Sequence, residues 1–292
     1  ISEIPLQNVN IFNHLYWTTT DSIGRFYLDD NFGEKDTITF SIVGYETMYL
    51  AKKDIPKNSI VINASKGIEI KSLKFISQVF EELLPGVGKK YVTLSGPSFA
   101  KDVASGLPTA VTLSCKKNSI LDKAATLFDN SNLKVYRSND IIGVEVSGAL
   151  KNVIAIGAGL IDGVGQSEST KAAFITRGLS EVRQFAKILG AKDSTFLGLS
   201  GVGDLMLTCY GIQSRNRNLG FMIGKGMNIS SVLKSSNSIA EGYFTVKAFI
   251  KLAKKFKFKS PILDSVYGVL YKKLSAKKLV TNIIKKGIIS DI

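Results

Sequence analysis

The chain has 292 residues, of which 45% are hydrophobic and 21% are charged, and its formal net charge is +14. This composition excludes intrinsic disorder, and the length is comfortable for two domains. Two distant cysteines exclude a disulfide scaffold, and a single histidine, His14, excludes most histidine-based catalysis and metal binding. The sequence therefore predicts a cytoplasmic protein with no metal site, whose proton-transfer residue is Lys, Asp, Glu or Tyr.

Hydropathy and charge narrow the class of partner. The longest apolar run, residues 153–161, is shorter than the roughly 18 residues that a membrane span needs, so we expect no membrane span. No charged segment precedes an apolar one near the start, so we expect no signal peptide. The positive charge favours anionic ligands, but the lysines are spread out and no aromatic residues alternate with them. We therefore expect no nucleic-acid partner.

The first half of the chain alternates between strand and helix patterns. Residues 1–34 have no clear period. After them, β-branched runs predict strands at 38–43, 59–64, 91–94, 110–114 and 134–136. Helical spacing of apolar residues predicts helices at 47–53, 71–84 and 120–128. Such alternation favours a parallel, doubly wound sheet.

After residue 140 the strand patterns stop. Helices are predicted at 143–160, 171–189, 200–208, 215–224, 231–233, 245–256 and 262–273. The sequence therefore predicts two domains, an α/β domain over 1–142 and a helical domain over 143–292.

Two candidate ligand turns follow predicted strands. In open α/β sheets, ligands bind beyond the carboxyl ends of the strands, where Lys66 lies in the turn Ser65-Lys66-Gly67. The segment 95–100 (SGPSFA) has the same placement, and Gly96 there permits close approach of the backbone to a ligand. A solvent-exposed lysine and a plain strand-to-helix turn are the alternative interpretations.

Lys151 is the strongest candidate for chemistry. It lies with Asn152 in an otherwise apolar run, 148–155, and burial lowers the pKa of a lysine toward neutrality. Asp204 and Thr208 share one helix face in a second apolar segment, so Asp204 is a candidate partner for a buried lysine. The alternatives are a lysine that extends to solvent and a carboxylate that caps a helix.

A further candidate is the segment Ser214-Arg215-Asn216-Arg217. Ser214 is typical of a helix N-cap, and the guanidinium of Arg215 is suited to gripping a phosphate. A basic surface turn is the alternative. By contrast, the glycines at 157 and 159 form only a weak dinucleotide fingerprint, because the third glycine position holds Asp162 and the helical pattern continues.

Six motifs in register give the chain a family resemblance. In order they are SKG, SGPSFAKDVASGLPTAV, IGVEVSGALKNVIAIGAG, GLSGVGDLMLTC, SRNRNLG and AEG, within roughly residues 36–280. Together they resemble the bacterial NAD(P)-dependent glycerol-3-phosphate dehydrogenases. The resemblance implies a Rossmann-type domain followed by an all-α substrate domain, and a homodimer. It also implies hydride transfer between sn-glycerol 3-phosphate and NAD or NADP, giving dihydroxyacetone phosphate and feeding glycerophospholipid synthesis.

The resemblance also assigns roles to residues. Lys151 would move the hydroxyl proton, Asp204 would hold Lys151, and Lys66 and Asn152 would orient the reacting oxygen. The implied substrate site comprises Lys66, Gly96, Ser98, Lys151, Asp204, Thr208, Ser214, Arg215 and Asn216. The implied dinucleotide site comprises Lys66, Ala100, Arg215, Ile239 and Glu241.

The start of the chain departs from the family pattern. Residues 1–50 contain glycine only at 24, 33 and 44, so no GxGxxG turn is possible there. We therefore expect the first βαβ unit to be missing or divergent. This leaves open an impaired remnant that binds a phosphorylated ligand without cofactor, and a related hydroxyacid dehydrogenase.

Overall fold

The computed structural model describes residues 10–12, 17–19, 37–41, 48–51, 60–83, 88–129, 131–235 and 240–279. The described strands near the start form an antiparallel sheet of order β2-β1-β3-β4. These strands are Asn10–Phe12 (β1), Trp17–Thr19 (β2), Thr37–Ser41 (β3) and Met48–Ala51 (β4). Of the strand predicted at 38–43, residues 38–41 lie in β3, and residues 42 and 43 lie outside the described residues. This strand belongs to the antiparallel sheet and not to a parallel one. The predicted helix at 47–53 is wrong, because β4 pairs with β3 and cross-strand pairing outweighs local propensity.

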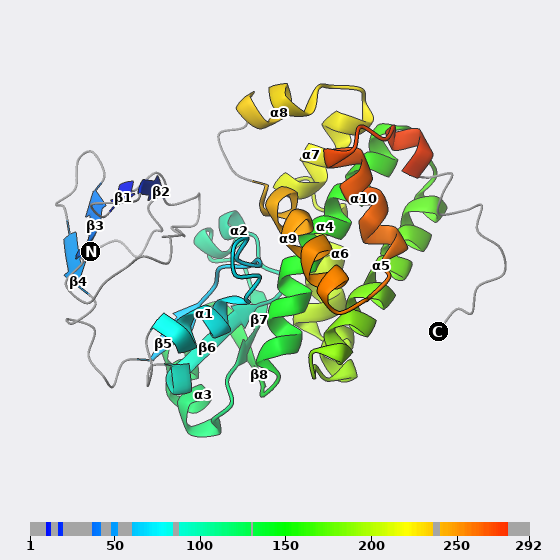
Figure 1. The fold of residues 1–292 in the computed structure, drawn as a ribbon. Coiled ribbons are helices and arrows are strands. Elements are labelled where there is room, and N and C mark those ends of the chain that lie inside the picture. Colours follow the sequence, from blue (N-terminus) through cyan, green and yellow to red (C-terminus); the bar gives the residue numbers. More distant parts are fainter. Residues whose placement is uncertain are drawn as a thin grey trace.

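A second four-stranded sheet, of order β5-β6-β7-β8, forms the α/β half (Figure 1). Its strands are Val61–Asn63 (β5), Tyr91–Ser95 (β6), Thr109–Ser114 (β7) and Leu133–Ser138 (β8). The outer pairs are parallel, as expected, but β6 and β7 are antiparallel. The chain leaves β6 into the short helix α2 (Ala100–Ala104) and returns directly into β7, which an antiparallel pair permits without a long crossover.

Two further helices belong to the α/β half. They are α1 (Ile76–Leu83) and α3 (Asn118–Ala125), close to the predicted helices at 71–84 and 120–128. The small apolar core under α3 consists of Val92, Leu113, Cys115, Leu121 and Ala124. The sheet with these helices places the carboxyl ends of β5 and β6 next to the helical half.

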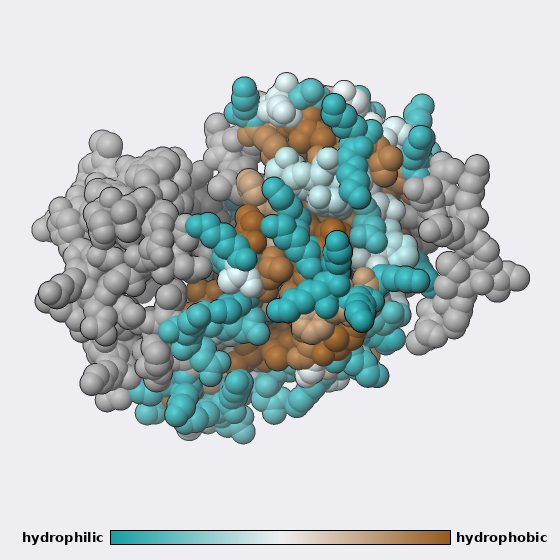
Figure 2. Space-filling model, viewed as in Figure 1, coloured by the Kyte–Doolittle hydropathy of each residue, from teal (hydrophilic) through white to brown (hydrophobic). Residues whose placement is uncertain are grey.

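The described residues after β8 contain helices and no further strand, as predicted. In chain order the helices are α4 (Ile141–Gly163), α5 (Glu168–Ile188), α6 (Asp204–Tyr210), α7 (Arg215–Gly224), α8 (Ile229–Ser235), α9 (Glu241–Lys255) and α10 (Pro261–Tyr271). Hydrophilic side chains are spread over the face of this half that Figure 2 shows, with apolar surface between them.

Helix α4 is the central element of the helical half. It contacts α5, α6, α7 and α9, and it is long and apolar enough to cross a membrane. Its most apolar stretch is nevertheless 94% buried inside the fold, so α4 is a core helix. A Cβ at Gly159 would lie 2.0 Å from the carbonyl oxygen of Arg217, so glycine lets α7 pack directly on the α4 backbone. The glycines at 157 and 159 lie inside this helix, as the helical pattern predicted.

Candidate active site

The Lys151 side chain lies inside the protein instead of extending to solvent. It is 8% exposed, and its ammonium bonds to Asp204 Oδ1 and to Thr208 Oγ1, the latter at 2.8 Å. Burial lowers the pKa of Lys151 to about 8; the Asp204 carboxylate opposes this shift and the Lys66 ammonium adds to it. Near neutral pH the amine can therefore both release and accept a proton.

Asp204 joins two lysines that are far apart in the sequence. Its Oδ2 atom lies 2.8 Å from the Lys66 ammonium, and Ser95 Oγ donates to the same oxygen at 3.3 Å. Burial opposes ionisation of Asp204, but the Lys151 and Lys66 ammoniums outweigh it and hold the pKa of the carboxyl below its ordinary value. The cluster therefore carries two ammonium groups on one carboxylate.

The backbone before α6 fixes the direction of Asp204. Leu199–Gly203 form a π-helical turn, and Asp204 is the first residue of α6. A Cβ at Gly201 would lie 2.4 Å from the Phe196 carbonyl oxygen, so only glycine fits. Ser147 Oγ, one turn before Lys151 on α4, donates to the Ser200 carbonyl at 2.6 Å. These contacts tie the start of α6 to the helix that carries Lys151.

The two turns at the carboxyl ends of β5 and β6 cover this cluster. A Cβ at Gly148 would lie 3.2 Å from Ser95 Oγ and 3.4 Å from Lys66 Cδ, so both turns pack against α4 at this glycine. Gly96 has a φ of +146°, and its Cβ would lie 2.9 Å from Val111 Cα. The glycine is thus required by close packing on β7, whereas the sequence interpretation gave close approach to a ligand as its reason.

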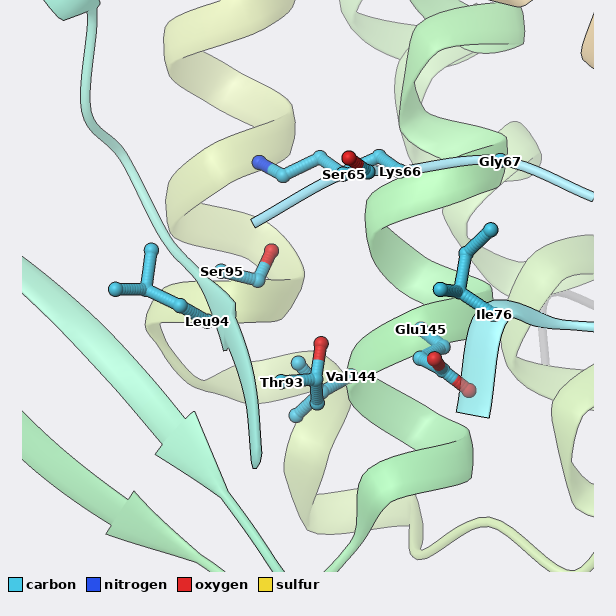
Figure 3. Close-up of a pocket in the computed structure, with 9 residues that line it drawn as sticks. All are labelled: Ser65, Lys66, Gly67, Ile76, Thr93, Leu94, Ser95, Val144 and Glu145. Carbon is cyan, nitrogen blue, oxygen red and sulfur yellow. The ribbon is translucent and has the colours of Figure 1, made fainter. Parts of the chain in front are cut away.

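A small pocket opens between these turns and α4 (Figure 3). Lys66 extends from its turn along one side, while Ser95 and Glu145 lie on β6 and α4. The lining residues are Ser65, Lys66, Gly67, Ile76, Thr93, Leu94, Ser95, Val144 and Glu145. The pocket therefore lies at the edge of the sheet where the predicted ligand turns meet.

A second polar cluster joins α4, α7 and α9. Asn152 Nδ2 donates to Glu241 Oε2 at 3.1 Å, and Asn216 Oδ1 accepts from the Gly242 amide at 2.9 Å. Ser214 caps α7 by accepting from the Arg217 amide, as predicted, and Arg215 is the first residue of that helix.

The remaining predicted residues lie as follows. Ser98 Oγ donates to the Gly96 carbonyl at 3.2 Å, in the turn that Ser95 begins. Ala100 is the first residue of α2. Ile239 lies outside the described residues. The structure thus gathers Lys66, Lys151, Asp204 and Thr208 into one cluster and Asn152, Asn216 and Glu241 into another.

Two buried polar residues near the site were missed from the sequence. Ser95 stands in the motif SGPSFA, where only the following residues were given roles. Glu145 is a charged residue in an apolar helix and is 8% exposed. The signal that identified Lys151, a charge within an apolar run, is present at Glu145 as well.

The small Rossmann-like α/β sheet, the helical half that follows it and the buried Lys151–Asp204 pair together point to the class of two-domain dehydrogenases. Two family models match the chain. The model described as the C-terminus of NAD-dependent glycerol-3-phosphate dehydrogenase matches residues 140–281, and its N-terminal counterpart matches residues 41–121. The chain belongs to the NAD-dependent glycerol-3-phosphate dehydrogenase family.

Individual relatives agree with this family. A glycerol-3-phosphate dehydrogenase (NAD(P)+) of Citrifermentans bemidjiense is 42% identical over 235 residues, covering 80% of this chain and 70% of the relative. One from Thermotoga sp. is 49% identical over 215 residues, covering 74% of this chain and 65% of the relative. The crystal structure of the glycerol-3-phosphate dehydrogenase of Coxiella burnetii matches with a TM-score of 0.73 at 31% identity, covering 77% of this chain and 68% of that one.

Proposed function

We propose that this chain interconverts sn-glycerol 3-phosphate and dihydroxyacetone phosphate by hydride transfer with NAD or NADP. The observation that carries the proposal is the buried Lys151 ammonium, held by Asp204 and Thr208 and with a pKa of about 8. A group with such a pKa suits proton transfer in both directions of a dehydrogenase reaction near neutral pH.

The geometry of the cluster supports the following proton step. In oxidation, neutral Lys151 takes the proton of the C2 hydroxyl while the hydride leaves C2, and a carbonyl forms. In reduction, the Lys151 ammonium returns that proton to the oxygen. Asp204 holds the amine in place, and the Lys66 ammonium and the Asn152 amide orient the reacting oxygen and stabilise its developing charge.

The phosphate end of the substrate requires a second set of donors. Arg215 is the first residue of α7, where its guanidinium and the positive end of the helix dipole favour a phosphate dianion. Gly96, Ser98, Ser214 and Asn216 complete the proposed substrate site. The excess positive charge of the Lys66–Asp204–Lys151 cluster also favours an anionic substrate.

The residues present fit a dinucleotide at the same edge. Ala100, Arg215 and Glu241 are the first residues of α2, α7 and α9, and the positive end of a helix dipole favours the phosphate groups of a dinucleotide. Together with Lys66 and Ile239 they make up the proposed dinucleotide site. When bound, the nicotinamide accepts or supplies the hydride.

Other expectations from the sequence and from the resemblance belong to this proposal. They are a division at residue 142 into a dinucleotide-binding and a substrate domain, a homodimer, a cytoplasmic location and a role in glycerophospholipid synthesis. Sedimentation of the purified chain tests the homodimer, and a single species of monomer mass would contradict it.

Turnover is the first test of the reaction. We expect the purified chain to oxidise NADH or NADPH when dihydroxyacetone phosphate is present, and the Lys151→Ala variant to lose roughly 10²-fold or more of kcat, since it lacks the proton-transfer group. The measurement is cofactor absorbance, with folding of both proteins checked by circular dichroism.

A different outcome would favour the second candidate, an impaired remnant. The observation in its favour is that residues 1–50 contain no GxGxxG turn. In that case the folded chain binds dihydroxyacetone phosphate in a calorimetric titration but binds neither NADH nor NADPH, and shows no turnover.

A further inference from the structure

A second buried carboxyl lies on the helix of Lys151. Glu145 accepts hydrogen bonds from the Ser77 amide at 2.8 Å, from the Ser77 hydroxyl, and from the Tyr91 hydroxyl at 2.8 Å. These bonds join α4 to the start of α1 and to the start of β6. Burial raises the pKa of the Glu145 carboxyl, and the hydrogen bonds from Ser77 and Tyr91 oppose that shift. The three donors hold the carboxyl in one position between α4, α1 and β6.

The Tyr91 hydroxyl continues the network toward the sheet. Tyr91 is 1% exposed, and its ring packs on Phe80 at a centroid distance of 5.5 Å. Burial, and then the charge of Glu145, raise the pKa of Tyr91 far above its ordinary value, so the hydroxyl stays protonated and donates to Glu145. Its oxygen accepts from Asn63 Nδ2 at 2.9 Å.

Asn63 connects this network to the lysine turn. It is the last residue of β5, and its side chain makes two hydrogen bonds to the backbone of Ser65. Its Nδ2 donates to the Ser65 carbonyl at 3.0 Å, and its Oδ1 accepts from the Ser65 amide at 3.1 Å. The next residue is Lys66, whose ammonium lies 2.8 Å from Asp204 Oδ2. An unbroken series of hydrogen bonds thus leads from α4 to the backbone that carries Lys66.

We propose that Asn63, Tyr91 and Glu145 are positioning residues that fix the Lys66 turn relative to α4 and thereby hold the Lys66 ammonium at Asp204. The inference rests on the proposed function, since it assigns a purpose to the geometry of that site. Glu145 and Lys151 belong to the same helix, α4. By fixing the Lys66 turn relative to α4, the network therefore also fixes the position of Lys66 relative to Lys151. Supporting hydrogen bonds of this kind orient the groups that do the chemistry.

Loosening the Lys66 turn has a defined electrostatic effect on Lys151. The titratable groups that act on Lys151 are Asp204 and Lys66, and its own charge acts on the buried thiol of Cys209. Withdrawal of the Lys66 ammonium removes a repulsive charge and leaves Asp204 to interact with Lys151 alone. Both changes favour the charged amine, so the pKa of Lys151 rises.

The test is the Tyr91→Phe variant, which removes the bridging hydroxyl and keeps the ring. The pKa of Lys151 is read by NMR titration of lysine-labelled protein, with the Lys151 signal assigned by its loss in Lys151→Arg. We expect the pKa to rise by about half a unit or more, a change of about threefold or more in the proton affinity. The pH midpoint of kcat/KM for glycerol 3-phosphate oxidation shifts by the same amount. Glu145→Gln shifts both in the same direction.

Two comparisons separate positioning from stability. Tyr271→Phe is the matched control, since it removes a hydroxyl that donates to the Tyr243 carbonyl at 2.7 Å within the helical half, and we expect it to leave the Lys151 titration unchanged. In a Lys66→Met background, Tyr91→Phe is expected to add no further shift, because the network then has no ammonium to position.

The inference is overturned if Tyr91→Phe and Glu145→Gln lower the melting temperature but leave the Lys151 pKa at its wild-type value. It is also overturned if the shift persists in full when Lys66 is Met. The NMR titration requires no turnover, so a wild-type chain without activity would contradict the proposed function and leave this test intact.

Discussion

The buried Asp204 carboxylate accepts hydrogen bonds from two ammonium groups, those of Lys151 and Lys66. This arrangement contributes to the pKa of Lys151. Burial is the largest influence and lowers the pKa of Lys151 to about 8, while the Asp204 carboxylate, shared with Lys66, opposes that shift only in part. A proton-transfer group needs such a balance because it must lose and regain its proton in every cycle.

This balance predicts opposite pH profiles for the two directions. Oxidation of glycerol 3-phosphate needs neutral Lys151, so kcat/KM is expected to rise as pH increases through about 8. Reduction of dihydroxyacetone phosphate needs the ammonium, so its kcat/KM is expected to fall over the same interval. Initial rates from pH 6.5 to 9.5 measure both. Profiles that move in the same direction, or stay flat between pH 7 and 9, would contradict the assignment of Lys151.

At the scale of elements, several helix ends depend on side chains from elsewhere in the chain. Helix α10 begins after Ser260, whose hydroxyl is buried and makes no hydrogen bond in the described structure. Instead, Glu181 from α5 accepts from the amides of Ile262 and Leu263, at 2.9–3.3 Å. A carboxylate from a neighbouring helix thus satisfies amides that a local cap would otherwise serve.

We predict that Glu181→Ala lowers the free energy of unfolding by about 1–2 kcal/mol, the usual cost of losing a helix cap. Ser260→Ala is the matched control at the same helix end, and we expect it to be neutral, because the hydroxyl it removes makes no bond. Urea unfolding measures both. Equal losses in the two variants would show that Glu181 does not cap α10.

Burial also makes the contribution of Glu181 depend on pH, since it raises the pKa of this carboxyl to about 7. The folded protein then binds the proton more tightly than the unfolded chain does. Stability from this group is present below about pH 4.5 and is lost as pH rises to about 7. The same urea series at pH 5 and pH 8 should therefore show a smaller difference in Glu181→Gln than in the wild type.

The elements that the sequence predicted correctly are those with local causes. Apolar spacing located the helices after residue 140, and Lys151 and Asp204 stood out as charges in apolar surroundings. The direction of β7 and the pairing of β4 depend on distant partners, so local patterns missed both. Asn63 and Tyr91 look like ordinary strand residues, and nothing nearby in the chain indicates that they bond to each other.

At the scale of the whole molecule, the site is assembled from both halves. Lys66 and Ser95 come from the α/β half and Asp204 from the helical half, and the contact of Lys66 with Asp204 spans 138 positions of sequence. No local pattern reveals a contact at that separation, which is why the sequence named both residues without pairing them. A ligand bound here contacts both halves at once.

Ligand binding should therefore stabilise the molecule as a unit. We expect dihydroxyacetone phosphate at about 100 times its Kd to raise the free energy of unfolding by about 2.7 kcal/mol in the wild type. In Arg215→Ala the same concentration should give much less, because a phosphate donor is lost. Urea unfolding with and without ligand measures this. Equal stabilisation by unphosphorylated dihydroxyacetone would contradict a phosphate site and favour a related hydroxyacid dehydrogenase.

The burial of α4 has a consequence for how the chain is made. The helices that cover α4, among them α7 and α9, lie further along the chain. During synthesis the apolar α4 is therefore made before the helices that bury it. During that interval it resembles a membrane span, yet Lys151 stands near its midpoint, where a charge opposes entry into a bilayer by about 2.5–3.5 kcal/mol. The residue proposed to transfer the proton in the folded protein would thus also oppose insertion of the unfinished chain into a membrane.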